Sequence, residues 1–378
     1  MGDALYQMVY NRLIDSIRDG TYPEGSRLPS EAELTKMYFV SRITTKKALN
    51  MLAQRGLVTR LPGKGTYVTV SSDKPEFLER LGRERTNLVG VILCNASATF
   101  GLDLLLGVEE EAAKHGYGMV FSRSYDSLEI EAAALRRLID LGAEGIIIQP
   151  VHGDSYSSDI IQLDLKGFPL ALVDRNMSRL SIPFAGTNNK SAAKQAALRL
   201  ISMGHVNLAF LASPVQGTST LEHRYFGVVE AFKEMGAPLR IDQWLTDLKS
   251  PLENSEQSNE EDIGHICQLL EKCPDVSCLF AAETSLAVLA HKACMRLGRL
   301  VPDDISIVCF DHAADYMGEP FFAHVRQRQA EMGAAACRLL IERIKAGSVP
   351  ESIFLETDFI SGETLSARPD GVKKENKP

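Results

Sequence analysis

The sequence predicts an α/β protein in which a small helical head with a β-hairpin precedes two doubly wound lobes. Two observations carry this prediction. Residues 1–70 show helical spacing followed by two short strand-like runs. From Leu88 onward, continuous apolar runs alternate with helical segments, a pattern typical of parallel sheets covered by helices on both faces. At 378 residues the chain is long enough for roughly two or three domains.

The composition is that of an ordinary globular protein. Hydrophobic residues make up 45% and charged residues 24% of the chain, which argues against long disorder, collagen and coiled coil. Apolar runs such as Leu88–Cys94 are too short to span a bilayer, and the N-terminus lacks the basic and apolar regions of a signal peptide. The seven cysteines are scattered through apolar segments, which favours a reducing compartment. We therefore expect a cytoplasmic protein without a membrane segment.

The charge is distributed unevenly along the chain. The formal net charge is −8, yet residues 1–70 carry ten basic and six acidic side chains, a net charge of +4. The remaining residues carry 31 basic and 43 acidic side chains, a net charge of −12. A basic head on an acidic body fits a small anion-binding module joined to a larger domain with another task.

The head is predicted to contain three helices and a hairpin. Ser30 and Glu33 form the pattern of a capping box, which predicts a short helix that ends near Tyr38. Ser41 can cap a third helix that ends near Gly56. Apolar residues of the first helix recur at helical spacing: Tyr6, Val9, Leu13 and Ile17. Two strand-like runs joined by a glycine-containing turn then predict the hairpin: Leu57–Leu61 and Thr66–Val70.

The body alternates strands with helices, and ligands of such folds bind at the carboxyl ends of the strands. Strands are predicted at Leu88–Cys94, Met119–Phe121, Gly145–Ile148, Leu170–Val173, Leu208–Ala212, Cys278–Ala281 and Ile305–Phe310. Helices are predicted around Lys190–Met203, Glu222–Met235, Glu260–Glu271 and Leu286–Leu297. Thr246–Asn259 is expected to be a long polar loop. The chain is thus divided into a head (1–70), a linker (71–86), a body (87–366) and a disordered tail (367–378).

Short helix, turn, capped helix and hairpin together make a winged helix-turn-helix. The head resembles the GntR-type DNA-binding domain over residues 4–70, in the motifs Leu28-Pro29-Ser30-Glu31-x-Glu33-Leu34, Val40-Ser41-Arg42-x-Thr44, Ala48-Leu49, Gly56-Leu57-Val58 and Gly63-Lys64-Gly65-Thr66-Tyr67-Val68. The resemblance implies double-stranded operator DNA as a partner. It places DNA contacts at Ser41, Arg42, Thr44, Lys46 and Gly65.

The chemistry of these residues agrees with the resemblance. Ser41 and Arg42 stand at the N-terminus of the recognition helix, where backbone N–H groups and the helix dipole favour a phosphate. Arg42 can donate two hydrogen bonds to a guanine in the major groove. Lys64 lies between two glycines of the wing, so that the backbone and one ammonium group can approach the DNA closely. For Lys47, a solvated helix face is as good an interpretation as a DNA contact.

Two residues depart from the GntR-type pattern. Phe39 stands where the family usually has a glycine in the turn, and a positive φ there would strain a phenylalanine. Lys46 stands where arginine is commoner, so a phosphate contact is expected from it in place of bidentate base reading.

The body resembles the LacI/GalR-type sugar-binding domain, a two-lobed fold like that of periplasmic binding proteins. The matching motifs are Val89-Gly90-Val91-Ile92, Gly142-Ala143-Glu144-Gly145-Ile146-Ile147, Leu172-Val173-Asp174-Arg175, Leu200-x-x-x-Gly204-His205 and Val301-Pro302-Asp303-Asp304-Ile305-Ser306-Ile307-Val308-x-Phe310-Asp311. A GntR-type head on a LacI-type body is similar to the arabinose-repressor group.

This resemblance implies an effector cleft between the lobes. Asp311 ends a predicted strand, where its carboxylate can accept hydrogen bonds from sugar hydroxyls, and Arg224 falls where the family commonly has a ligand-binding arginine. At Ala282 and Glu283 the family often has Asn-Asp, which is a departure. For each candidate the alternative is an inter-lobe salt bridge or a satisfied surface group. The candidates are Asn95, Phe100, Asp174, Arg175, Thr220, Arg224, Glu283 and Asp311. Thr220 and Glu283 are weaker ones, as is Gln149.

These features predict a repressor of a carbohydrate-utilisation operon that binds a palindromic operator as a homodimer and is released by a small sugar. One alternative keeps the architecture with a non-sugar effector such as a nucleoside. A second is an enzyme on the α/β body with the head as a regulatory addition. The sequence shows no convincing catalytic constellation and no paired cysteine or histidine spacing of a metal site. We therefore expect no enzyme activity, no metal and no cofactor.

Overall fold

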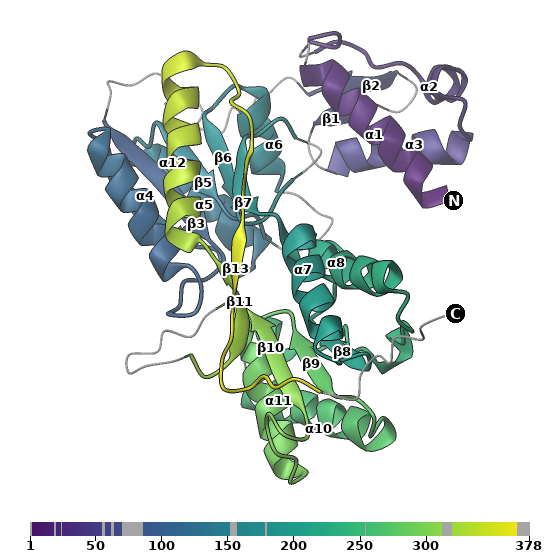
Figure 1. The fold of residues 1–378 in the computed structure, drawn as a ribbon. Helices are drawn as coiled ribbons and strands as arrows, with labels where there is room; N and C mark the ends of the chain where they lie inside the picture. The colour runs from purple at the N-terminus through teal and green to yellow at the C-terminus, as the bar shows by residue number, and fades with distance from the viewer. Residues whose placement is uncertain are drawn as a thin grey trace, which may run out of the picture.

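The computed structural model has a head beside a body of two lobes (Figure 1). It describes residues 2–18, 20–23, 25–54, 57–61, 64–69, 86–151, 157–177, 180–253, 255–311 and 320–368. The mixed α/β class with a helix-turn-helix head and a two-lobed parallel-sheet body is the one the sequence predicts. All of the predicted linker except Thr86 lies outside the described residues.

The head is a three-helix unit with a two-stranded wing. Its elements are α1 (Gly2–Arg18), α2 (Glu31–Tyr38), α3 (Arg42–Gln54), β1 (Val58–Leu61) and β2 (Gly65–Val68). The capping box of Ser30 and Glu33 is present at the start of α2. Ser41 Oγ accepts a hydrogen bond from the Thr44 backbone N–H at 3.2 Å, so it caps α3 as expected. The turn between α2 and α3 places Phe39 at φ 54°, in the left-handed region.

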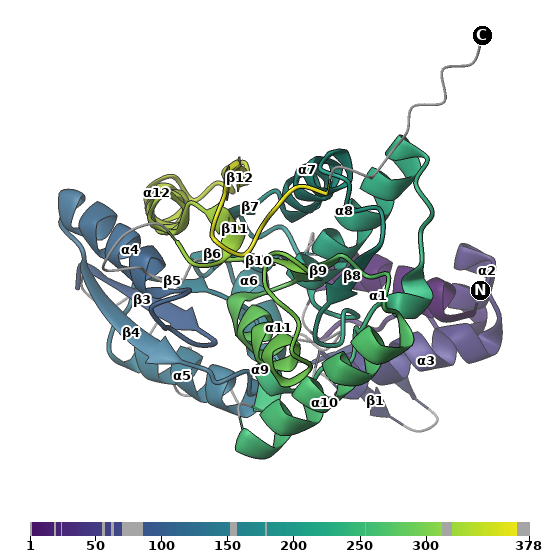
Figure 2. The same ribbon diagram turned by 60° about the horizontal axis from the view of Figure 1, so that its bottom comes forward.

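The first lobe is a six-stranded sheet in which every pair of strands is parallel. Its order is β12-β7-β6-β5-β3-β4. Helices α5 and α6 cover one face and α4 and α12 cover the other, as Figure 2 shows for α5 against α4 and α12. The elements are β3 (Leu88–Leu93), α4 (Leu102–Lys114), β4 (Gly118–Arg123), α5 (Leu128–Asp140), β5 (Gly145–Ile148), α6 (Ser158–Leu165), β6 (Leu170–Val173), β7 (Phe184–Thr187), α12 (Gln329–Ala346) and β12 (Ile353–Leu355).

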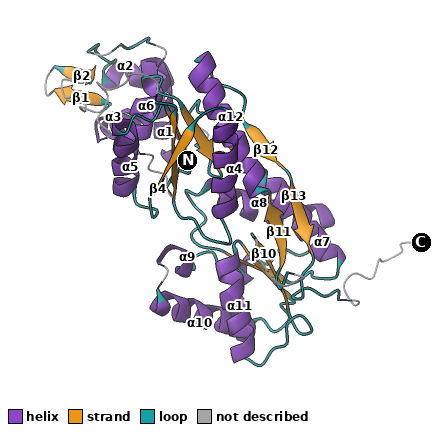
Figure 3. Cartoon of the chain, turned by 90° about the vertical axis from the view of Figure 1, so that its left-hand side faces the viewer, coloured by secondary structure: helices purple, strands orange, loops and turns teal. Residues whose placement is uncertain are grey.

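The second lobe is a five-stranded sheet of order β13-β11-β10-β9-β8, with only the edge strand β13 antiparallel to its neighbour. Helices lie on both faces of this sheet (Figure 3). Its elements are α7 (Asn189–Ser202), β8 (Leu208–Leu211), α8 (Ser219–Met235), η2 (Ile241–Gln243), α9 (Ser250–Glu253), α10 (Glu256–Lys272), β9 (Cys278–Ala281), α11 (Thr284–Arg296), β10 (Ser306–Phe310), β11 (Ala323–Gln327) and β13 (Thr357–Ile360).

The chain crosses between the lobes three times, and all three crossings are short. They follow β7, β11 and β12, which lead into α7, α12 and β13 respectively. Neither lobe is therefore a continuous segment of sequence. Three short connections at one edge allow the lobes to rotate about a hinge, as in other closures of two rigid domains.

Two expectations about the body are corrected. Thr246–Asn259 is not a loop throughout, because it contains α9 and the first turn of α10. Ser255 caps α10 by accepting a hydrogen bond from the Ser258 N–H at 3.1 Å. The tail was expected to begin at residue 367, but Arg368 donates its backbone N–H to Met203 O at 2.8 Å, so ordered chain extends through Arg368. Residues 369–378 lie outside the described part.

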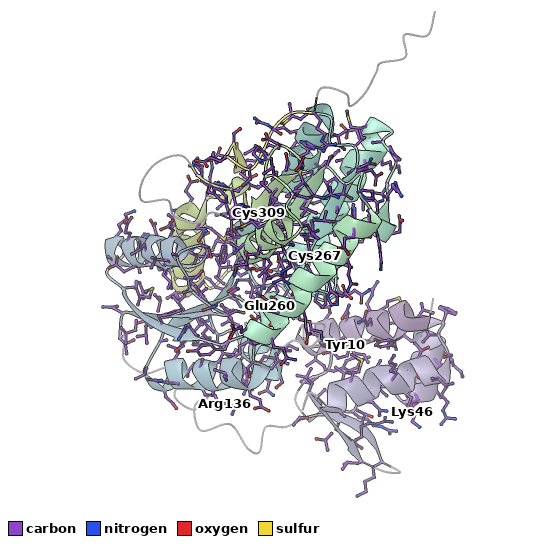
Figure 4. The ribbon with its side chains drawn as sticks, turned by 90° about the horizontal axis from the view of Figure 1, so that it is seen from below. Tyr10, Lys46, Arg136, Glu260, Cys267 and Cys309 are labelled. Carbon is purple, nitrogen blue, oxygen red and sulfur yellow. The ribbon has the colours of Figure 1, made fainter. Side chains whose placement is uncertain are left out.

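The head contacts the body through α6. Ile161 of α6 is buried in the same apolar cluster as Tyr10 and Ile14 of α1, and Leu165 packs against that cluster. Figure 4 shows Tyr10 at the edge of the head next to the body, with Lys46 on the outer side. Within the described residues, none of the helices has the length and apolar character needed to cross a bilayer.

Candidate functional site

A cavity between the two lobes collects all eight effector-binding candidates. The first lobe contributes loops after β3, β5 and β6, and the second contributes the start of α8 and the residues after β9 and β10. These are carboxyl ends of strands, where open α/β sheets bind ligands. The predicted residues that line it are Asn95, Phe100, Asp174, Arg175, Thr220, Arg224, Glu283 and Asp311. Gln149 lines it too, as do residues that sequence reasoning missed: Cys94, Ser97, Thr99, Asp126, Ser213, Leu221, Pro251, Thr284, Ser285 and Gln327.

Two aspartates occupy equivalent places in the two lobes. Asp174 follows β6 with φ 60°, and Asp311 follows β10 with φ 73°. Gln149 Nε2 donates to Asp174 Oδ2 at 2.7 Å, and Gln327 Nε2 donates to Asp311 Oδ1. The left-handed backbone turns each chain sharply at the strand end, and each carboxylate is held at the cavity wall by an amide.

The two arginines of the cavity are each fixed by their own lobe. Arg224 Nε donates to Asn189 Oδ1 at 2.7 Å, and its guanidinium carbon lies 4.0 Å from the centroid of the Phe310 ring. Arg175 Nη1 donates to Asp126 Oδ1 at 2.8 Å. Neither arginine is an inter-lobe ion-pair partner in these contacts. Both remain part of the cavity lining, so their orientation is set before any ligand arrives.

The cavity has an excess of acidic groups. Four carboxylates line it, from Asp126, Asp174, Glu283 and Asp311, against the guanidinium groups of two arginines. Burial, together with the neighbouring charge of Asp311, raises the pKa of Glu283 to about 7. Burial also raises the pKa of Asp311 to about 6, even though Arg224 lowers it, and the pKa of Asp174 is raised for the same reason. No group of three or more histidine, cysteine or acidic side chains in the described part of the chain could hold a metal ion.

The outer end of the head carries the predicted DNA contacts. Ser41 is exposed just before α3, Arg42 and Lys46 are exposed on α3, and Lys64 is exposed in the wing. Thr44 is half-buried, with its Oγ1 2.8 Å from Ser41 Oγ. Lys47, whose role the sequence leaves open, places its Nζ 3.7 Å from the centroid of the Tyr6 ring.

Gly65 is required by the geometry of the wing. It has φ 121°, and a Cβ atom there would lie 2.7 Å from Arg27 Nε. The positive φ therefore favours glycine, whereas the flexible end of the Arg27 side chain could move away from a Cβ atom.

An ion-pair network that the sequence does not reveal ties α3 to the wing. Glu31 accepts from Arg42 Nε at 3.2 Å and from Arg60 Nη2 at 2.6 Å, and Arg60 Nη1 donates to Asn50 Oδ1. Although burial opposes the charged form, the two guanidinium groups hold the pKa of Glu31 below its ordinary value. Arg60 is thus a further basic residue beside the recognition helix. In the sequence, only the position of Arg60 in the first strand of the wing could have indicated this role.

The fold and the two candidate sites define a class of protein. Residues 5–68 match the gntR family of bacterial regulatory proteins, and residues 197–365 match the periplasmic binding protein-like domain. The chain therefore joins a gntR-type helix-turn-helix head to a periplasmic binding protein-like body. Both resemblances seen in the sequence are confirmed.

Among curated proteins, the chain is similar to arabinose metabolism transcriptional repressors over nearly its whole length. The repressor of Halalkalibacterium halodurans is 22% identical over 350 residues, covering 91% of this chain and 90% of that one. The repressor of Geobacillus stearothermophilus is 24% identical over 360 residues, covering 91% and 92%. A ribose operon repressor of Halalkalibacterium halodurans is 25% identical over 317 residues, covering 83% and 89%.

Solved structures share the fold. A complex of the transcriptional regulator CelR with cellobiose has a TM-score of 0.64 and 22% identity, covering 86% of this chain and 92% of that one. A LacI family regulator from Enterococcus faecium with bound ribose has a TM-score of 0.59 and 21% identity, covering 74% and 100%.

Proposed function

We propose that this protein is a transcriptional repressor that binds operator DNA through its head and releases it when a small sugar binds between the lobes. One observation carries the proposal: a cavity lined by polar groups of both lobes lies at a hinge that the chain crosses three times. Relatives named as arabinose and ribose repressors support the sugar, and the gntR-type head supports the DNA. The protein would act in the cytoplasm, as a homodimer on a palindromic site.

The charge of the cavity favours a neutral ligand. Its four carboxylates outnumber its two guanidinium groups, and both guanidinium groups already contact acceptors of their own lobe. An anionic sugar, such as a sugar phosphate or a sugar acid, would bring a further negative charge next to these carboxylates in a buried site, which selects against it. The hydroxyls of a neutral sugar can donate to Asp174, Asp311 and Glu283. Phe100, also in the lining, offers an apolar face for the ring.

Ligand binding would act by closing the lobes. A sugar that contacts Asp174 in the first lobe and Asp311 in the second binds both only when they approach each other, so it stabilises the closed arrangement. Because the head packs against α6 of the first lobe, closure changes the position of the second lobe relative to the head. In a dimer this changes the spacing of the two heads and weakens binding to two half-sites. We assign binding and not catalysis to the cavity.

The test uses the full-length chain in two steps. Thermal unfolding is followed with arabinose, ribose and cellobiose, and with ribose 5-phosphate and gluconate as anionic counterparts. We expect a neutral sugar to raise the melting temperature, because a ligand that binds the folded protein stabilises it by mass action. The anions should not bind, so they should leave the melting temperature unchanged. The stabilising sugar is then added to the protein on selected DNA, which it should release. Nucleosides are tested in the same way, and stabilisation by nucleosides alone would favour the non-sugar alternative.

A further inference from the structure

The outward face of α3 has an isoleucine at its centre. Thr45, Ala48, Leu49 and Leu52 of α3 are buried in the head. At about 100° per residue, the opposite side of the helix is centred on Ile43. Its side chain is 81% exposed. The same face continues with Lys46, Lys47 and Asn50, all exposed.

Among the residues of the head that the structure describes, no packing contact accounts for an isoleucine at this position. A β-branched side chain lowers helix propensity relative to alanine, and an exposed one contributes no apolar burial. Phe39, which lies shortly before α3, is a second exposed apolar residue that does not stabilise the head. It is 95% exposed and has a left-handed backbone, φ 54°, that costs a non-glycine residue free energy. Two large apolar side chains are therefore presented to solvent at the N-terminal end of one helix, amid basic residues.

We propose that Ile43 determines base specificity by contacting the C5-methyl group of a thymine in the major groove of the operator half-site. This inference rests on the proposed function, since it needs α3 to enter the groove. The thymine methyl is the apolar group that base pairs present in the major groove. The face is continuous with Arg42 and Lys46, and the head has a net charge of +4. DNA therefore matches this surface twice, because its phosphates complement the basic residues and the thymine methyl group complements the apolar side chain of Ile43.

The experiment begins with the sequence that the protein prefers. The full-length chain selects binding sites from a pool of random-sequence duplexes at fixed salt. Each dT of the selected half-site is then replaced by dU, which removes only the methyl group. We expect one position in each half-site at which this replacement weakens binding of the unaltered protein about fourfold, the effect of one buried methyl group.

The matched variants are Ile43→Ala and Met295→Ala. Ile43→Ala should bind the dT and dU duplexes equally, and sites selected with it should lose the preference for thymine at that position. Alanine favours the helix, so the head should remain folded. Met295 is an exposed apolar residue of α11 in the body, and its replacement should leave the dT-to-dU ratio as in the unaltered protein.

Different outcomes overturn different statements. If a site is selected but no dT-to-dU replacement affects binding, or if Ile43→Ala keeps the same methyl dependence, the assignment of Ile43 is wrong while DNA binding stands. If Ile43→Ala changes only the sedimentation of the protein, this face binds protein and the assignment also fails. If no sequence is enriched and no duplex is bound, both the proposed function and the assignment of Ile43 are wrong.

Discussion

The hydroxyl of Thr187 donates to Gln327 Oε1 at 2.7 Å, and the amide nitrogen of the same glutamine donates to Asp311. Thr187 ends β7 of the first lobe and Gln327 ends β11 of the second, each just before the chain crosses to the other lobe. Asp311 lines the cavity. A continuous line of hydrogen bonds therefore joins the candidate effector site to two of the three crossings.

The first prediction concerns this line of hydrogen bonds. Thr187→Val keeps the shape of the side chain but leaves the buried Oε1 of Gln327 without its donor, which costs about 1–3 kcal/mol. We expect the free energy of unfolding of the body to fall by this amount in urea titrations. Ser361→Ala, at an exposed position of the second lobe just after β13, is the control. An unchanged free energy of unfolding in Thr187→Val would show that the bond contributes nothing.

The second prediction concerns the effector. Arg224→Ala removes a guanidinium group from the cavity, and Asp311→Asn replaces a charged carboxylate acceptor with a neutral amide. Both variants should therefore weaken sugar binding strongly and leave the head intact. In the proposed repressor, these variants stay on the operator when sugar is added. Operator binding is measured against sugar concentration, with Asp358→Asn, an exposed partner of Arg326, as the control. Release at the unaltered sugar concentration by both variants would mean that the residues are outside the site. Loss of DNA binding without sugar would mean that they are structural.

The third prediction concerns pH. The pKa of Glu283 is raised from its ordinary value to about 7 in the folded protein. The folded state therefore binds more protons than the unfolded state between about pH 4.5 and pH 7. Stability from this group is complete below that window and is lost as the pH rises through it. We expect the melting temperature to fall with rising pH across this window, and Glu283→Gln to reduce the slope. An equal slope in that variant would contradict the raised pKa.

The fourth prediction concerns DNA. Arg42→Ala should weaken binding to the selected site by about 1–3 kcal/mol and relax base preference, because a bidentate contact to guanine is lost. Lys64→Ala should weaken binding to all sequences alike and reduce its dependence on salt, because a phosphate contact releases a counterion. Both are measured as binding curves on selected and scrambled duplexes at several salt concentrations. If Arg42→Ala keeps both its affinity and its discrimination between selected and scrambled duplexes, Arg42 forms only the ion pair with Glu31 and does not contact the DNA.

Local sequence patterns were enough to predict much of the architecture. The capping box at Ser30, the cap at Ser41 and the apolar runs that became β5, β6 and β9 depend on neighbours within a few residues, so spacing reveals them. The strand-end position of Asp174 followed from the run that became β6, and that of Asp311 from the run that became β10. The pattern failed at Thr246–Asn259, because the first turn of a surface helix such as α10 is polar on all sides and looks like a loop.

The sequence by itself determined the winged head, the alternation of strands and helices, and which polar residues end which strands. Only the tertiary structure decided which of those ends face one another. Gln327 contacts Asp311 and Thr187 because the chain leaves and re-enters each lobe. Glu31 contacts both Arg42 and Arg60, and Arg60 is 29 positions away in the sequence. Such contacts depend on how separate segments pack and not on the order of neighbouring residues. Local patterns of apolar and polar residues therefore cannot predict them.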